Sequence, residues 1–104
     1  MSKKRNVRRE FPHVSEFLET ALFRRRREMK ISQTTLAARV GLSRNCIQQM
    51  ECREHLPLPS TISRLIRGLE FSGEETARFW AGIDAAYAQD HALQGDQTKT
   101  HEVI

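Results

Sequence analysis

Apolar residues recur at helical spacing through most of the chain, and two closely spaced stripes stand out in residues 33–52. The first stripe is followed at once by Gly41, and the second contains Ile47 and Met50. A glycine directly after the last apolar position commonly ends a helix in a left-handed conformation, and Ser43 can cap the helix that follows. The pattern therefore predicts two short helices joined by a very short turn.

The second of these helices has an outer face of unusual composition. With Ile47 on the buried side, a helical wheel places five residues on the outer side: Arg44, Asn45, Gln48, Gln49 and Cys52. Surface helices normally mix acidic and basic residues, whereas this face has no carboxylate. Arginine can donate two hydrogen bonds to guanine, and asparagine or glutamine can donate and accept at adenine. We therefore expect contacts to DNA bases from Arg44, Asn45, Gln48 and Gln49.

The stretch 33–52 resembles the DNA-binding motif of the Cro and phage-repressor type helix-turn-helix family, also called the XRE family. The likeness rests on a glutamine, a small residue, a glycine and three apolar residues: Gln33, Ala37, Gly41, Leu42, Ile47 and Met50. It covers about residues 15–71, including a loop that ends in proline and the apolar stripe of a fourth helix. The resemblance implies a five-helix, all-α, repressor-like DNA-binding domain. It also implies that the second motif helix enters the major groove, usually in a dimer on a two-fold operator.

Helices are also predicted on both sides of the motif. Before it, an apolar stripe covers residues 11–28, and Ser32 can cap the first motif helix. After it, the prolines of residues 56–59 enforce an extended crossing before the next helix. On that next helix Arg64 and Arg67 lie opposite the apolar stripe, where we expect solvated charges.

Four consecutive arginines, residues 24–27, end the first predicted helix. Consecutive helical residues point about 100° apart, so the four cannot form one patch, and some must lie along the core edge with buried stems. We expect one or two phosphate contacts from this run, with simple solvation as the alternative. Arg25 departs from the family, which usually has an aliphatic residue at this position.

Ser72 and Glu75 form a capping box that opens a long amphipathic helix over residues 73–90. Its wide apolar stripe includes four large residues: Phe79, Trp80, Ile83 and Tyr87. This width exceeds what covering a four-helix core requires, and two-fold interfaces tend to use aromatic residues. We expect these four residues either to form a homodimer interface or to complete the core of the monomer.

Residues 1–10 hold five cations and, besides the first methionine, one apolar residue. Such a segment cannot bury enough surface to fold by itself, so it is predicted to be a flexible basic arm that lies along phosphates or enters a minor groove. The alternative is a tail that only aids solubility. Helix N-termini also suit phosphate oxygens. The expected DNA-backbone contacts are therefore Gln33, Ser43, Lys3, Lys4, Arg5, Arg8 and Arg9.

The arm is followed by the predicted domain, residues 11–90, and by a polar tail, residues 91–104, that we expect to be disordered. Net charge runs from +6 in residues 1–30 through +3 in residues 31–69 to −5 in residues 70–104. This asymmetry predicts a basic part that binds a polyanion. The acidic part then faces away from the nucleic acid or meets a protein partner.

The remaining chemistry excludes several classes of protein. A chain of 104 residues forms one small domain, and no catalytic set, zinc pattern or redox cysteine pair is present. We therefore expect a non-enzyme that needs no cofactor or metal. No apolar run is long enough to span a membrane and no secretory signal is evident, so a cytoplasmic protein is predicted.

Together these features predict a sequence-specific transcriptional regulator, a repressor that binds double-stranded DNA at a palindromic or repeated operator as a homodimer. The alternative is an interaction module, such as an antitoxin or a co-regulator, that uses helix 73–90 as its partner surface.

Overall fold

The computed structural model describes the backbone of residues 6–103 and the side chains of residues 6–94. Over the described backbone the chain forms six helices and no strand, which confirms the predicted all-α class. The helices are α1 Val7–Glu10, α2 Pro12–Met29, α3 Gln33–Val40, α4 Arg44–Glu51, α5 Pro59–Gly68 and α6 Gly73–Val103.

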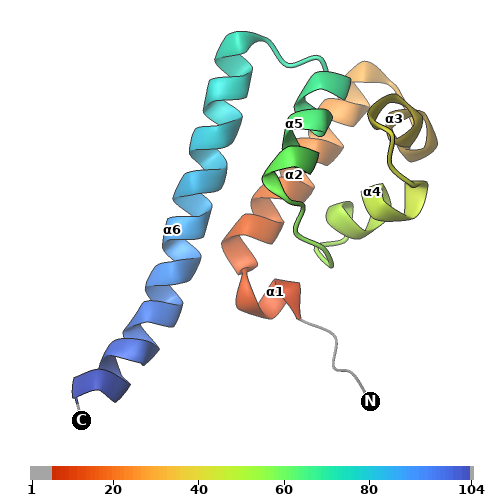
Figure 1. Cartoon of the computed structure of the whole chain (residues 1–104). Helices are drawn as coiled ribbons and strands as arrows, with labels where there is room; N and C mark the ends of the chain where they lie inside the picture. Colours follow the sequence, from red (N-terminus) through yellow and green to blue (C-terminus); the bar gives the residue numbers. More distant parts are fainter. Residues whose placement is uncertain (1–5, 104) are drawn as a thin grey trace.

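The helices enclose two apolar clusters. In Figure 1, α6 runs along one side of α2 and α5, whereas α3 and α4 lie on their other side. The α6 core joins α2, α5 and α6 through Phe11, Val14, Leu18, Ile62, Ile66, Phe79, Ile83 and Ala86. The motif core joins α2, α3, α4 and α5 through Leu22, Leu36, Ala37, Val40, Ile47, Met50, Leu65 and Leu69. Because α2 and α5 contribute to both clusters, they place the motif and α6 relative to each other.

Several helix boundaries are those that the sequence predicts. The Ser32 hydroxyl accepts a hydrogen bond from the backbone N–H of Thr35 (3.0 Å), which caps α3. Ser72 and Glu75 form the reciprocal capping box of α6, with distances of 2.9 and 3.1 Å. These side chains bind N–H groups that have no partner within the helix. Each capping residue lies within three positions of the group it binds, so the sequence pattern is enough to predict it.

The N-terminal segment differs from the predicted arm because residues 7–10 form α1. Asn6 caps this short helix by accepting a hydrogen bond from the backbone N–H of Arg9 (3.1 Å). Val7 is only 6% exposed. The segment cannot fold alone, but the rest of the domain covers its one apolar residue, and that burial is a tertiary effect. The helix count is therefore six, not the expected five, over the described residues.

The last helix is also longer than predicted. Residues 73–90 are helical as expected, but α6 continues to Val103, through most of the segment for which we expected disorder. Extending an existing helix adds one hydrogen bond per residue without a new nucleation cost, so polar composition alone does not end it. The Gln94 side chain also donates to the backbone carbonyl of Glu10 at the end of α1 (3.0 Å).

A buried carboxylate from α6 holds the start of α2. The N-cap residue of α2, Phe11, makes no side-chain capping bond. Instead Asp90, which is 0% exposed, accepts hydrogen bonds from the backbone N–H groups of His13 (3.1 Å) and Val14 (3.0 Å). The Nδ1 atom of His13 lies 2.7 Å from the same carboxylate. Sequence pattern could not show this cap, because the capping residue lies 76 positions from Val14 along the chain.

Candidate nucleic-acid interface

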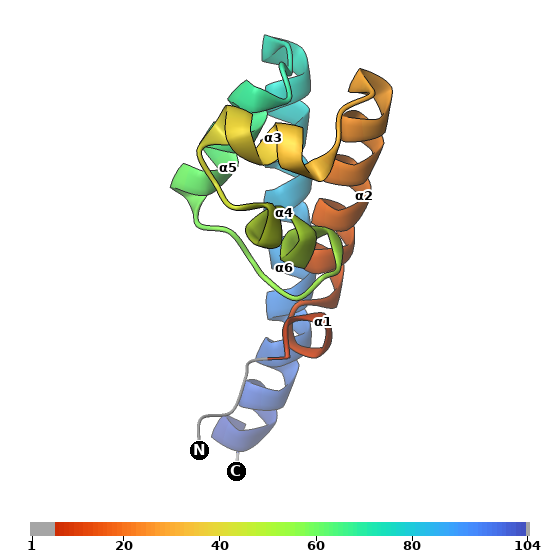
Figure 2. The same cartoon turned by 90° about the vertical axis from the view of Figure 1, so that its right-hand side faces the viewer.

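The turn between α3 and α4 has the predicted geometry. Gly41 ends α3 in the left-handed region with a φ of +72°, which a residue with a side chain rarely adopts. Ser43 then caps α4, and its hydroxyl accepts from the backbone N–H of Cys46 (3.1 Å). As Figure 2 shows, α4 follows α3 after a short turn and crosses in front of α6. The predicted helix-turn-helix is therefore present.

One face of α4 is polar and open. Arg44, Asn45 and Gln48 are exposed, and none of them makes a hydrogen bond or an ion pair through its side chain to a described residue. Gln49, the fourth predicted base contact, is half-buried. The opposite face carries Ile47, which is 0% exposed, so the helix has one packed and one accessible side.

An ion pair fixes α4 against α2. The Arg26 guanidinium donates to both carboxylate oxygens of Glu51, at 2.8 Å from Nε and 2.9 Å from Nη2, and its Nη1 donates to the backbone carbonyl of Ile31 (3.1 Å). The hydrogen bonds to Glu51 raise the pKa of Arg26 above its usual value. Side-chain exposure is 12% for Arg26 and 6% for Glu51, so the pair is largely shielded from water. Two-point contact of this kind sets both position and orientation.

Gln33 belongs to the same cluster. Its Nε2 donates to Oε1 of Glu51 (3.0 Å), which ties the start of α3 to the end of α4. The sequence predicts Gln33 as a phosphate contact, and the structure gives its side chain this intramolecular partner as well. Its backbone remains at the N-terminus of α3, where N–H groups favour anions.

The predicted basic arm is partly anchored. Arg8 donates from Nε (3.2 Å) and Nη2 (2.9 Å) to the backbone carbonyl of Cys52, the residue that caps the C-terminus of α4. Arg9 is exposed, and Lys3, Lys4 and Arg5 lie outside the described residues. Arg8 therefore stabilises the end of α4, a role that the sequence pattern does not reveal.

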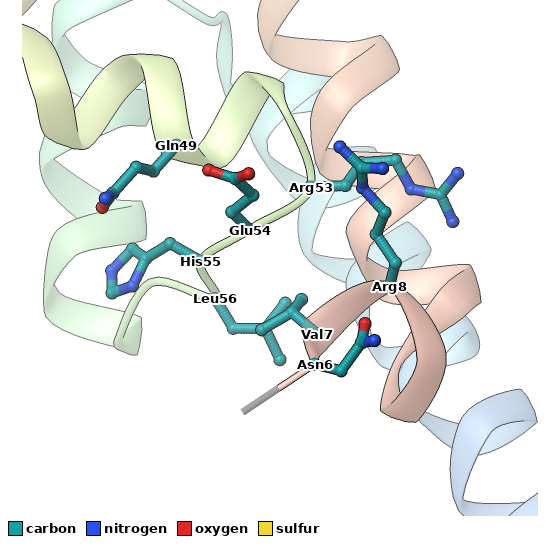
Figure 3. Close-up of a pocket in the computed structure, with 8 residues that line it drawn as sticks. All are labelled: Asn6, Val7, Arg8, Gln49, Arg53, Glu54, His55 and Leu56. Atoms are coloured by element: carbon teal, nitrogen blue, oxygen red, sulfur yellow. The ribbon is translucent and has the colours of Figure 1, made fainter. Parts of the chain in front are cut away.

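A polar hollow separates α1 from the segment between α4 and α5 (Figure 3). Val7 and Leu56 also line it, and Gln49 and His55 lie on the side away from Arg8. Nearby, Arg53 donates to the Ser15 hydroxyl (3.1 Å) and to the Pro12 carbonyl (3.0 Å). These contacts hold the segment that follows α4 against the beginning of α2.

The arginine run of α2 is divided between structure and solvent. Arg25 donates to the carbonyls of Leu69 (2.8 Å) and Glu70 (2.9 Å), and Arg26 binds Glu51. Arg24 and Arg27 are exposed. This division agrees with the expectation that some of these side chains lie along the core edge. The contacts of Arg25 also explain why an arginine stands at position 25, where the family usually has an aliphatic residue. The guanidinium binds the backbone carbonyls at the C-terminal end of α5.

The aromatic stripe of α6 mostly completes the monomer core. Phe79 is 5% and Ile83 is 3% exposed, and both pack in the α6 core. The Phe79 ring lies 5.5 Å from the ring centroid of Phe17. Trp80 and Tyr87 are half-buried at the edge of this core. Of the two expectations for this stripe, the structure supports the core for Phe79 and Ile83, because these two side chains have little surface left for a partner.

Other kinds of site lack support among the described residues. No group of three or more histidine, cysteine, aspartate or glutamate side chains is placed to hold a metal ion in this part of the chain. Cys46 and Cys52 are free thiols. Within the same residues, no helix combines the length and apolar character needed to cross a membrane.

The fold and the exposed face of α4 define a helix-turn-helix domain. A family model described as a helix-turn-helix domain matches residues 20–79, more than half of the chain, and the protein belongs to this family. The match indicates a DNA-binding regulator. Comparison with curated proteins gives no match, and comparison with solved structures gives none either.

Proposed function

We propose that the protein is a sequence-specific transcriptional regulator of the Cro and phage-repressor type, which acts as a repressor and inserts α4 into the major groove of DNA. The observation that carries this proposal is the outer face of α4. Arg44, Asn45 and Gln48 are exposed there without an intramolecular side-chain partner among the described residues. These residue types match the donors and acceptors of base edges in the major groove.

The rigidity of α4 supports the same function. Glu51 fixes its last turn to Arg26, and Arg8 holds the backbone just beyond it. A helix held in this way presents its outer side chains in one arrangement, so binding loses less conformational entropy. Phosphate contacts from Gln33, Ser43 and the basic N-terminal residues would then set the register of the helix in the groove.

We infer further that two copies bind an operator with two related half-sites, since a reading helix in this class contacts only a few base pairs. With Phe79 and Ile83 in the monomer core, the dimer contact must use other residues. Trp80 and Tyr87 keep part of their surface exposed and remain the candidates on α6.

Selection of bound sequences from a random duplex library, at near-physiological salt, tests the proposal. The wild type should yield a motif with two related half-sites whose centres are separated by about 10 base pairs or a multiple of that distance. Arg44→Ala should cost about 1 to 3 kcal/mol at the selected site and relax the preference at one base position.

Arg78→Ala is the matched control, because Arg78 is an exposed arginine on α6 whose ion pair is with Glu74. It removes one positive charge without touching α4, and the selected motif should persist. Binding without any sequence preference in the wild type, or equal losses on selected and scrambled duplexes after Arg44→Ala, would contradict base reading by α4.

A further inference from the structure

A cluster of arginines lies beside the turn of the helix-turn-helix, on the side of α5. The hollow between α3 and α5 is lined by Arg39, Val40, Arg64, Arg67, Gly68 and Glu70. Three guanidinium groups therefore face one carboxylate. The sequence predicts Arg64 and Arg67 only as solvated charges, but their position next to the turn gives them a more specific environment.

Arg64 lies closest to the turn. A Cβ atom added at Gly41 would stand 3.5 Å from its Nη2 atom, which places the guanidinium against the backbone that leads into α4. Ser43, the cap of α4, is two residues further along the chain. The guanidinium charge is thus held near the N-terminal end of α4, where backbone N–H groups also favour an anion.

The cluster has an excess of positive charge, because three arginines share one glutamate. Arg39 donates to Oε2 of Glu70 (3.2 Å) and to the Gly68 carbonyl (3.5 Å), so the one acidic residue of the hollow already has a partner. The side chains of Arg64 and Arg67 are exposed and make no hydrogen bond or ion pair to any described residue. An anion bound at Arg64 would therefore displace no internal contact.

The position of α5 indicates which anion this is. In Figure 2 the beginning of α3 lies to one side of α4, and α5 lies to the other side. A helix with its side chains is about 10 to 12 Å wide and nearly fills a major groove about 12 Å wide. Groups on both sides of α4 therefore meet the phosphates that border the groove. Gln33 is the proposed phosphate contact at one border of the groove. Arg64 is the cationic side chain beside the turn at the other border.

We propose that Arg64 binds a DNA phosphate on the groove border opposite the one approached by the start of α3, with Arg67 adding positive charge behind it. This inference rests on the proposed function, because it assumes that α4 enters the major groove. Arg64 would strengthen binding to every sequence and leave the base preference to α4.

Fluorescence anisotropy with a labelled duplex, measured over a range of salt concentrations, tests the proposal. The selected and a scrambled duplex are each titrated with wild type and Arg64→Gln, which removes the charge but keeps a polar side chain. Loss of one phosphate contact should make the slope of log K against log salt shallower by about 0.9 on both duplexes. The affinity lost between about 50 and 200 mM salt should then shrink about 3.5-fold.

Arg78→Gln carries the same change in net charge on α6 and should keep the wild-type slope. Circular dichroism should show that both variants remain folded. If Arg64→Gln keeps the wild-type slope while the wild type is still site-selective, the Arg64 proposal is wrong and the proposed function stands. If the wild type shows no site preference, the proposed function fails, and the role of Arg64 fails with it.

Single neutral methylphosphonates along the selected duplex provide a second measurement. One substitution that weakens binding of the wild type should have no further effect on Arg64→Gln, because the contact is already absent. If every methylphosphonate weakens the two proteins equally, Arg64 contacts no phosphate and the proposal is overturned.

Discussion

Glu51 and Asp90 are both buried carboxylates, but they hold different halves of the domain and have different partners. Glu51 fixes α4 to α2 and α3 through the charged Arg26 and the amide of Gln33. Asp90 fixes α6 to the start of α2 through two backbone N–H groups and the Nδ1 atom of His13. One contact therefore positions the surface that we propose to read DNA, and the other docks a supporting helix.

The difference in partners determines what happens when each carboxylate is lost. Removal of Glu51 leaves a guanidinium charge in a largely buried place, whereas removal of Asp90 leaves neutral N–H groups without their acceptor. Unpaired buried charge is more costly than an unpaired neutral donor. The half of the molecule that carries the proposed function thus depends on the more vulnerable contact.

Glu51→Ala is expected to have the largest effect. Breaking a buried ion pair by removing one partner typically costs about 3 to 5 kcal/mol, a large share of the stability of a small domain. Urea unfolding followed by circular dichroism measures the loss. The exposed Glu54→Ala is the matched control and should change little.

A double variant, Arg26→Met with Glu51→Leu, sharpens the same prediction. Replacing both charges by apolar side chains removes the unpaired charge, and most of the lost stability should return. A loss below about 1 kcal/mol in Glu51→Ala would show that Arg26 is well solvated without its partner and would remove the proposed contrast with Asp90.

Asp90→Ala should have the next largest effect, about 1 to 3 kcal/mol, because it removes an interhelical cap from two N–H groups. Hydrogen exchange distinguishes the two halves: the amides of His13 and Val14 should exchange faster in Asp90→Ala while those of α4 stay protected. Asp84→Ala, on the exposed face of the same helix, should leave these amides unchanged. Faster exchange throughout α4 in Asp90→Ala would show that the halves are not independent.

Sequence reasoning was most successful where the signal is local. The left-handed Gly41, the caps at Ser32 and Ser43 and the stripe that buries Ile47 all depend on neighbours within a few residues, and the structure has each of them. These features define the motif and the exposed face of α4. The exposed face is therefore well predicted, although contact with DNA stays a prediction.

The contacts that sequence reasoning missed join residues far apart in the chain. Glu51 binds Arg26 across 25 positions, Arg8 reaches Cys52 across 44, and Asp90 reaches Val14 across 76. Each depends on how helices pack, which periodicity does not specify. Burial of Val7 is the same kind of effect, and for that reason α1 appears where composition alone indicates a flexible arm.

Two glycines extend the comparison to helix packing. A Cβ at Gly68 would lie 2.3 Å from Cγ1 of Val40 in the motif core, and one at Gly82 would lie 2.4 Å from Cζ of Phe17 beside the α6 core. Val40 is buried and β-branched, so it cannot move easily, whereas Phe17 is half-buried and can turn outward.

Gly68→Ala should therefore cost about 1 to 3 kcal/mol through overpacking. Gly82→Ala should be close to neutral, since the helix propensity of alanine offsets the smaller rearrangement. Thermal unfolding measures both, and 1 kcal/mol corresponds to about 4 to 8 °C in a domain of this size. Equal shifts in the two variants would mean that the motif core is no less adaptable than the α6 core.

The smallest expected effect is at Glu75, whose carboxylate is exposed to solvent in the capping box of α6. The hydrogen bond from the backbone N–H of Ser72 lowers the pKa of Glu75, and the charges of Arg25 and Arg78 act in the same direction. A lowered pKa in the folded state stabilises the protein at pH values above the unfolded pKa of about 4.3, and this contribution disappears as pH falls through the folded pKa.

Glu75→Gln keeps an acceptor for the capping box and removes only the charge. Chemical unfolding between about pH 3 and pH 7 should therefore show wild type and variant diverging as the pH rises from the folded pKa of Glu75 toward about 4.3, and a constant difference at higher pH. The wild type should be the more stable protein at neutral pH and lose that advantage in acid. Asp84→Asn, an exposed acidic residue without a capping partner, should show a smaller divergence. If Glu75→Gln and Asp84→Asn follow the same curve, the hydrogen bond to Ser72 adds nothing beyond the general charge of α6.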